Sequence, residues 1–500
     1  MKKIFFGFSI FVIVLLFAGC NAKGSANNGT SPSGTALSQD FFSGEIRGEI
    51  TVSAYNSFSY RNFLEEAARA FEALYPGTKV NVETFSAMPE IRTGQQGGGQ
   101  MMVVEMRDDP QGRSDYINRV NTNLMSGAGA DIYAMDVLPL NKFIEGGTLE
   151  NLDSYMEMDA AFNKGDYRQN ILDALRYRNG TWFLPLDYNF NYFTYDTTLI
   201  PAEIAGSLGI DKTFNIEELL KMGLGLYNGS YKLFNMQDYS RGPRSMFSIL
   251  LSENIHSYLD LWNKKPNFVD GSFVAFLNSV KNYGEQGLIP QGVTGQQDAG
   301  QLRQRSMEAP TDRFYFKQYN AINLLSLFTR KLGIMVRMAE GGMAAGIDSD
   351  DEIAGIEANA DGSVPFTFSN GYGINSRSKN KLTAWAFLKF LLSKEMQLST
   401  NILNMSLPVN NEARAEKAGL TFAGFFRNSG GVLNEQQREA LEDYKATVET
   451  LSDKINSFVI RDSSLNDMIA QEVRYFFDGS RTAEEVARIL QNKADLYLSE

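Results

Sequence analysis

The chain has 500 residues, of which 43% are hydrophobic and 21% are charged, and its formal net charge at pH 7 is −12. This length exceeds what one hydrophobic core normally fills, so we expect two or three domains. Lys and Arg are scattered along an acidic chain and form only short runs, which argues against a protein that binds nucleic acid.

The N-terminus has the pattern of an export signal. Two lysines precede an apolar run over 4–17, which is too short to span a bilayer, and we expect residues 1–19 to be a signal peptide. Phe-Ala-Gly before Cys20 resembles the bacterial lipoprotein signal, with Phe17 where Leu is usual. The resemblance implies acylation of Cys20 and anchoring to a membrane; a plain secretory signal and an N-terminal anchor are the alternatives. Residues 20–45, rich in Gly, Ser, Asn and Thr, predict a flexible tether.

Residues 49–85 predict a strand-helix-strand unit. Residues 49–55 are strand-like, 61–74 carry apolar residues at the helical period, and 79–85 alternate between apolar and polar. Such a unit is typical of a parallel sheet covered by helices. The Gly-rich stretch over 86–113 interrupts this pattern, and we expect an inserted loop or hairpin there.

The rest of the chain carries further α/β elements. A short strand over 130–135 ends at Asp136, and Trp385 lies on an apolar helical stripe that predicts burial in the core. The stretch 290–313 predicts a loop. Capping boxes are predicted at Asn215–Glu218 and Thr482–Glu485. The helical period predicts helices near 115–127, 138–144, 244–254, 272–284, 319–330 and 378–393, and another from 482 onward.

The chain lacks the usual signatures of enzymes. It has one histidine, His256, which we expect to be a packed or surface residue of a helix. Its one cysteine, Cys20, would be acylated as the new N-terminus, so the mature chain would have no free thiol. These counts exclude the common zinc sites and a Cys-His nucleophile, and no GxSxG or phosphate-binding loop is present. We predict no catalytic residue, metal or cofactor. A paired-carboxylate glycosidase stays open, because sequence cannot show the separation of two carboxylates. The acidic run 348–352 leaves calcium as an alternative to a solvated loop.

Several segments, taken in order, carry a family resemblance. They are FEALYPGTKVNVETF at 71–85, the segment 126–155 that contains Asp136, NGTWFLPLDYNFNYFTYDTTL at 179–199, FSNGYGINSRSKNKLTAWAFLKFLLS at 368–393, and the C-terminal helix. Together with the lipoprotein start, these segments resemble the extracellular solute-binding proteins of ABC importers, the group that includes maltose-binding protein.

The resemblance implies an α/β fold of the periplasmic binding protein type II class, with two lobes joined by a hinge. It places the N-lobe at 46–188 and 352–410, and the C-lobe at 189–351 and 411–500. The chain would first cross between the lobes near 186–192 and again near 346–366. The insertion at 86–113 departs from the shorter members of the family.

Candidate solute-binding residues come from three patterns. Polar and aromatic residues follow predicted strands, where ligands of open α/β sheets bind. Alternation through the first crossing predicts Asp187, Asn189 and Asn191 on one face and Tyr188 on the other. Tyr372, flanked by glycines, matches a family position where an aromatic residue meets the solute. The predicted site contains Tyr55, Asn56, Ser57, Asp136, Asp187, Tyr188, Asn189, Asn191, Asp348, Asn370, Gly371 and Tyr372.

The resemblance implies a monomeric binding protein that captures a sugar or oligosaccharide and delivers it to ABC permease subunits served by a separate ATPase chain. We expect it on the outer face of the cytoplasmic membrane, or in the periplasm if the host has an outer membrane. The alternatives are the same fold with a peptide, polyamine or phosphorylated solute, and a surface glycan-degrading enzyme or adhesin.

Overall fold

Five strands from distant parts of the chain form the first sheet, in the order β2-β1-β5-β16-β6. The computed structural model describes residues 39–499, apart from 56–57, 86–89, 97–98, 106–109, 236–241, 262, 290–312, 333–349, 400–405, 426–431 and 459–461. The strands are β1 (Gly48–Tyr55), β2 (Thr78–Phe85), β5 (Ile132–Ala134), β6 (Leu184–Pro185) and β16 (Gly371–Ile374). β1 runs parallel to β2 and β5, whereas β16 is antiparallel to β5 and β6. The predicted strand-helix-strand unit is confirmed.

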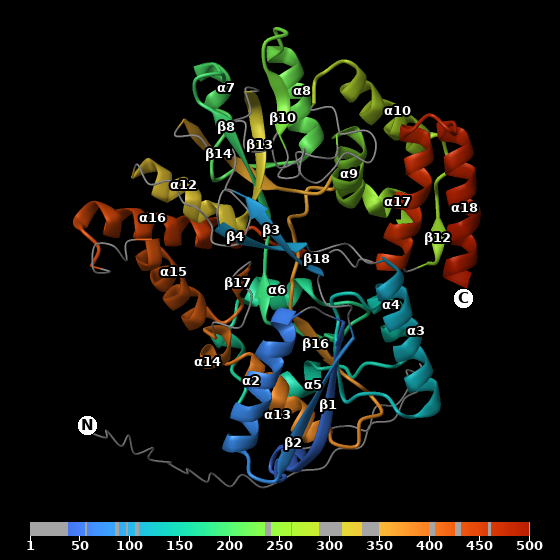
Figure 1. The fold of residues 1–500 in the computed structure, drawn as a ribbon, viewed down its shortest axis with the longest axis vertical. Coiled ribbons are helices and arrows are strands. Elements are labelled where there is room, and N and C mark those ends of the chain that lie inside the picture. Colours follow the sequence, from blue (N-terminus) through green and yellow to red (C-terminus); the bar gives the residue numbers. More distant parts are fainter. Residues whose placement is uncertain are drawn as a thin grey trace, which may run out of the picture. The chain divides into compact units, whose positions relative to one another are not determined.

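Helices pack against this first sheet (Figure 1). The apolar side chains of Phe63, Leu64, Ala67 and Phe71 recur along one face of α2 and are buried. The Phe71 ring meets Phe387 edge-on at 5.2 Å, which joins α2 to α13. α1 (Gln39–Phe42) precedes β1, and the helices that follow strands of the first sheet are α2 (Phe58–Leu74), α3 (Pro110–Ser126), α4 (Leu140–Glu145), α5 (Asp153–Met158), α6 (Gln169–Ala174), α13 (Lys381–Leu391) and α14 (Lys394–Gln397).

The second sheet has the order β10-β13-β8-β14-β9. Its central strand β8 pairs antiparallel with both β13 and β14. Its strands are β8 (Asn191–Asp196), β9 (Thr213–Phe214), β10 (Lys232–Asn235), β13 (Phe314–Asn320) and β14 (Asp351–Glu357).

The helix predicted over 319–330 begins too early. β13 continues to Asn320, a 3-10 turn spans Ala321–Asn323, and α12 covers Leu324–Lys331. β13 was not predicted from the sequence. Because residues 314–319 are buried on both faces, the strand lacks the alternation that marks a half-buried strand.

A second group of helices belongs to the second sheet. α17 packs against α9, and α18 packs against α10 and α17. Both predicted capping boxes are confirmed: Asn215 and Glu218 exchange bonds at the start of α8, as do Thr482 and Glu485 at the start of α18. The helices of this group are α7 (Ala202–Ala205), α8 (Ile216–Leu226), α9 (Gly242–Tyr258), α10 (Ser272–Glu285), α17 (Ser463–Phe477) and α18 (Ala483–Ser499).

Two links run between the sheets. β6 in the first sheet is followed by β8 in the second, so 186–190 form one link, and 358–370 lead back from β14 to β16. These links overlap the predicted crossings, while the predicted lobe boundaries stay a prediction. Short strand pairs brace the links: β7 (Asp187–Tyr188) with β17 (Leu407–Pro408), and β15 (Pro365–Phe366) with β18 (Ser457–Phe458).

The remaining elements lie outside the two large sheets. The insertion predicted over 86–113 contains an antiparallel hairpin of β3 (Glu90–Gln96) and β4 (Gly99–Glu105), placed between β2 and α3. A second hairpin pairs β11 (Leu259–Asp260) with β12 (Lys265–Pro266). α15 (Asn411–Phe425) packs on α16 (Glu435–Ser452), and α16 also contacts α12.

The buried apolar side chains form two clusters. The first cluster centres on β1, β5, α2 and α13 and continues through the links, whereas the second centres on α8, α9, α10, α17 and α18. Trp385 is fully buried in the first cluster, as predicted, and its indole Nε1 donates to Asp159 at 2.7 Å. Asp159 also accepts from Lys389, so this buried carboxylate is neutralised by specific donors.

We expect Trp385→Ala to destabilise the protein by about 3–5 kcal/mol, measured as the free energy of unfolding of the part built on the first apolar cluster. The substitution removes a fully packed aromatic side chain. It also takes one donor from Asp159. Urea titration followed by circular dichroism measures the change, with Leu74→Ala as the control because Leu74 is 58% exposed. Equal midpoints for the two variants would contradict the core assignment.

Candidate solute-binding edge

Three parallel strands of the first sheet end at the same edge. β1 ends at Tyr55 and β2 ends at Phe85, and the two residues are paired in register. β5 ends at Ala134, and Asp136 follows two residues later. Because ligands of open α/β sheets bind at the carboxyl ends of the strands, this edge is the candidate site.

An aromatic cluster lines this edge. The Tyr55 ring lies 5.6 Å from Tyr116 and 6.5 Å from Phe85, and Phe85 lies 5.8 Å from Tyr116. The Tyr116 hydroxyl bonds the Ser53 hydroxyl at 3.2 Å, which holds the ring against β1. The guanidinium of Arg119 lies 5.6 Å from the centre of the Phe85 ring. The adjoining pocket is lined by Ser53, Glu83, Thr84, Phe85, Tyr116, Arg119, Val120 and Asn123.

Sequence reasoning missed two members of this cluster, Phe85 and Tyr116. Phe85 is the last residue of a predicted strand, so the rule that selected Tyr55 could have selected it. Tyr116 lies on α3, and no local pattern shows that this helix leans over the ends of β1 and β2.

Asp136 is exposed to solvent, but nearby protein atoms partly desolvate its carboxyl group. Its side chain is exposed, yet desolvation by the surrounding protein raises its pKa to about 7. The backbone N–H groups of Asp136 and Val137 act in the opposite direction and lower the pKa. With this pKa the carboxyl group can both donate and accept a hydrogen bond near neutral pH.

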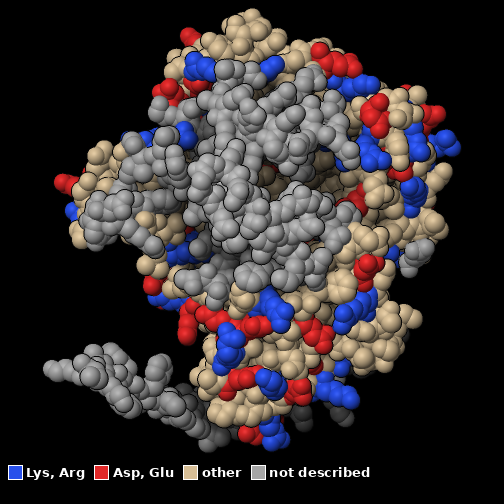
Figure 2. Space-filling model, viewed as in Figure 1, with Lys and Arg blue, Asp and Glu red and all other residues tan. Residues whose placement is uncertain are grey.

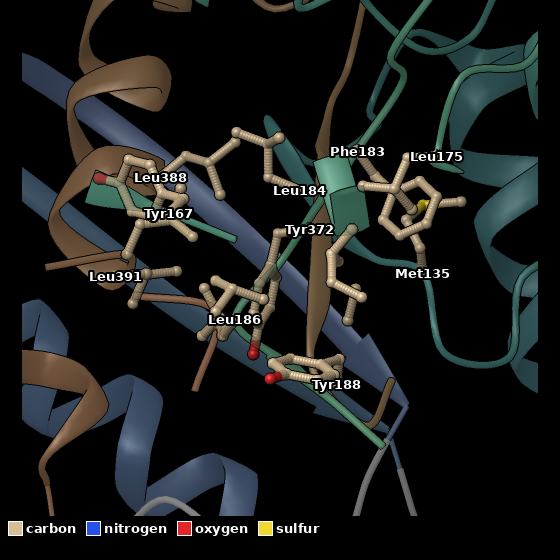
Figure 3. Close-up of a cluster of buried hydrophobic side chains, with 14 of the residues drawn as sticks. Met135, Tyr167, Leu175, Phe183, Leu184, Leu186, Tyr188, Tyr372, Leu388 and Leu391 are labelled. Atoms are coloured by element: carbon tan, nitrogen blue, oxygen red, sulfur yellow. The ribbon is translucent and has the colours of Figure 1, made fainter. Parts of the chain in front are cut away.

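Tyr372 lies on β16, the neighbour of β5. It pairs with Ala134 in register and is buried, and the pKa of its hydroxyl is raised first by burial and then by the nearby charges of Asp136 and Asp187. Figure 3 shows Tyr372 within the buried cluster that also contains Leu186 and Tyr188.

The glycines beside Tyr372 allow close packing. A Cβ on Gly371 would meet the Phe368 ring at 2.8 Å, and a Cβ on Gly373 would meet the Trp182 carbonyl at 2.9 Å. Because these two positions are glycines, the segments around Phe368 and Trp182 can pack directly against β16, which places Tyr372 next to the loop that carries Asp136.

Asp187 and Asn370 are brought together by the two links. One carboxylate oxygen of Asp187 accepts from the backbone N–H of Ser369 at 2.7 Å and of Asn370 at 3.3 Å, and the other accepts from the Asn370 side chain. Burial raises the pKa of Asp187, and these bonds together with the charge of Lys417 offset part of that effect. Both oxygens are engaged by protein donors, so contact of either residue with solute remains a prediction.

The other crossing residues divide between core and surface. The Tyr188 ring is fully buried, and its hydroxyl bonds Ser452 at 3.0 Å. The Asn189 side-chain oxygen accepts from the N–H groups of Phe190 and Ala321. Asn191 is exposed. Tyr188 is buried and Asn191 is exposed, which fits their predicted opposite faces, but Asp187 is buried and does not share the exposure of Asn191.

Four predicted residues, Cys20, Asn56, Ser57 and Asp348, lie outside the described residues.

Two other predictions can be compared with the structure. His256 is exposed on α9. Asp351 of the acidic run is fully buried and forms an ion pair of 2.9 Å with Lys317. Within the described part of the chain, no group of three or more His, Cys, Asp or Glu side chains could hold a metal ion.

Basic and acidic side chains are interspersed on the face drawn in Figure 2. In the portion of the chain that the structure describes, no helix combines the length and hydrophobicity needed to cross a membrane.

Residues 94–423 match the family model of the bacterial extracellular solute-binding proteins. The chain belongs to this family. Its members are binding proteins, and the two-lobe periplasmic binding protein fold predicted from the sequence is confirmed. A search of curated proteins found no match.

Solved structures of similar fold include three binding proteins. An ABC substrate-binding protein from Listeria monocytogenes, in complex with cycloalternan, has 15% identity and a TM-score of 0.51 over 91% of this chain and 99% of that one. A family 1 extracellular solute-binding protein from Alicyclobacillus acidocaldarius has 15% identity and a TM-score of 0.51 over 91% and 100%. A family 1 protein from Bifidobacterium longum subsp. infantis has 15% identity and a TM-score of 0.50 over 90% and 99%.

Asp136 should make the stability of this solute-binding protein depend on pH. Its pKa of about 7 in the folded protein lies above the value of about 3.9 in an unfolded chain, so the folded state holds the proton more tightly. The contribution of Asp136 to stability therefore falls as pH rises from about 4 to about 7, and then stays constant.

We expect the difference in melting temperature, Asp136→Asn minus wild type, to increase as pH rises from about 4 to about 7 and to level off above about pH 8. Differential scanning calorimetry at a series of pH values measures it. Curves for the two proteins that stay parallel over the whole range would contradict the raised pKa.

Proposed function

We propose that this protein is the solute-binding subunit of an ABC importer and that it captures a carbohydrate at the edge formed by Tyr55, Asp136 and Tyr372. It is held to the membrane through acylated Cys20 and works as a monomer outside the cytoplasm. The loaded protein docks on a membrane permease, and a separate chain supplies ATP hydrolysis.

One observation carries the choice of solute: an exposed acidic residue, Asp136, lies close enough to Tyr116 of the aromatic cluster of Tyr55, Phe85 and Tyr116 for its charge to raise the pKa of the Tyr116 hydroxyl, after the larger effect of burial. A pyranose ring presents an apolar face and a rim of hydroxyl groups. The aromatic rings pack against the face, and Asp136 bonds the hydroxyls. A solute that lacks a bonded hydroxyl leaves a desolvated partner unpaired, and this gives the site its selectivity. The cycloalternan bound by the Listeria monocytogenes protein supports a carbohydrate.

Solute capture involves movement of the two sheets about their links. The links 186–190 and 358–370 join the sheets, and each is short enough to bend as a hinge. Closure needs a solute that binds the closed arrangement more tightly than the open one, because equal affinity for both shifts nothing. In this proposal Asn191 adds an exposed polar group to the site, and Asp187, Tyr188, Asn189, Asn370 and Gly371 form its floor. Contact of Asn56, Ser57 and Asp348 with solute stays a prediction from the sequence.

A thermal-shift screen with mono- and oligosaccharides tests the proposal. We expect at least one carbohydrate to stabilise the protein by about 2.7 kcal/mol when present at a hundredfold excess over its dissociation constant. Peptides, polyamines and sugar phosphates form the comparison set. Stabilisation by a member of that set, with none by a neutral sugar, would contradict the carbohydrate assignment.

Asp136→Asn should weaken binding of the carbohydrate found in that screen by about 10- to 100-fold, because a charged group contributes about 1.5–3 kcal/mol to a hydrogen bond. Isothermal titration calorimetry measures the affinity. Asp443→Asn is the matched control, since Asp443 is an exposed carboxylate on α16, a helix that packs on α12 and α15. Equal affinities for the two variants would remove Asp136 from the site.

A further inference from the structure

Polar contacts join α3 and α4 to α17 and α18, beside the candidate edge. The guanidinium of Arg113 on α3 contacts both carboxylate oxygens of Asp467 on α17, at 2.9 and 3.0 Å. These side chains are only 17% and 29% exposed. The Ser463 hydroxyl, in the first turn of α17, donates to the Val137 carbonyl at 3.0 Å. Val137 directly follows Asp136, so this contact reaches the solute edge itself.

A second arm of contacts runs through Tyr497 of α18. The ammonium of Lys142 on α4 lies 3.6 Å from the centre of the Tyr497 ring and donates to the Tyr497 carbonyl at 3.2 Å. The Tyr497 hydroxyl contacts both oxygens of Asp462, at 3.0 and 2.9 Å. Asp462 in turn caps α17 by accepting from the N–H groups of Ser464 and Leu465. Lys142, Tyr497 and Asp462 therefore tie α4 to the same helix start that carries Ser463.

The two sides of these contacts belong to different cores. α3 and α4 contribute Tyr116, Val120 and Phe143 to the first apolar cluster, whereas α17 and α18 contribute Leu465 and Leu490 to the second. The named contacts between them are ionic, hydrogen-bonded or cation–π. Polar interfaces between domains of one chain separate more readily than apolar cores, because water can replace their hydrogen bonds.

We infer that Arg113–Asp467 and Lys142–Tyr497–Asp462 form a separable latch that holds the first-sheet helices against the C-terminal helices next to Asp136. The latch goes beyond the proposed function and does not depend on the identity of the solute. It sets how often the two sides part next to Asp136.

Spin-label distances without solute test the latch. Cys20 is the only cysteine of the chain, so Cys20→Ser leaves no native thiol to label. Labels are placed at Met125→Cys on α3 and Leu496→Cys on α18, which are 87% and 64% exposed. Pulsed electron paramagnetic resonance then measures the distance distribution between the two sides. Removing one ion pair should raise the population of the long-distance form by about fivefold, the upper range for such a pair.

Arg113→Asp and Asp467→Arg should each produce this rise, and the charge-swapped double variant should reduce it. Arg176→Asp is the matched control, because Arg176 follows α6 and pairs at 3.0 Å with Asp153 of α5, away from α17 and α18 in the chain, and it should leave the distances unchanged. Arg113→Gln and Asp467→Asn replace the reversed charges if those variants do not fold. Distances that match the wild type in both single variants, or a double variant that separates as much as the singles, would overturn the latch.

Discussion

The buried carboxylate of Asp187 joins the two chain segments that connect the sheets. It lies in the first link and accepts bonds from Ser369 and Asn370 of the second, so one buried group ties both segments that connect the sheets. A buried carboxylate needs such donors, and a hydrogen bond to a charged group contributes about 1.5–3 kcal/mol to stability. Paired backbone bonds between Asn189 and Thr367 continue the connection along the links. In the proposed hinge closure the two links would therefore bend together rather than separately.

The candidate site follows from the strand directions on one side of these links. Because β1, β2 and β5 are parallel, Tyr55, Phe85 and Asp136 come to the same edge. Tyr372 reaches that edge from β16, whose neighbouring glycines admit close packing. The order of strands in the sheet, rather than any contiguous motif, brings an accessible carboxyl group into an aromatic setting suited to a ring with hydroxyl groups.

Much of the fold could be predicted because it is encoded locally. The period of α2, the capping boxes at Asn215 and Thr482, and the burial of Trp385 each depend on a few neighbouring residues. β13 escaped prediction because burial on both faces removes alternation. The partners of Asp187 could not be predicted, because Ser369 and Asn370 lie 182 and 183 residues away and no single sequence shows such a pairing. Tyr116 was missed for the same reason, since α3 reaches the site only through tertiary packing.

The most direct measurement is a crystal structure of the protein grown with the carbohydrate that raises its melting temperature. The account predicts a sugar ring against the Tyr55–Phe85–Tyr116 cluster, with hydroxyl groups bonded to Asp136, between the two lobes. A sugar bound away from the carboxyl ends of β1, β2 and β5, with Asp136 facing only water, would contradict it.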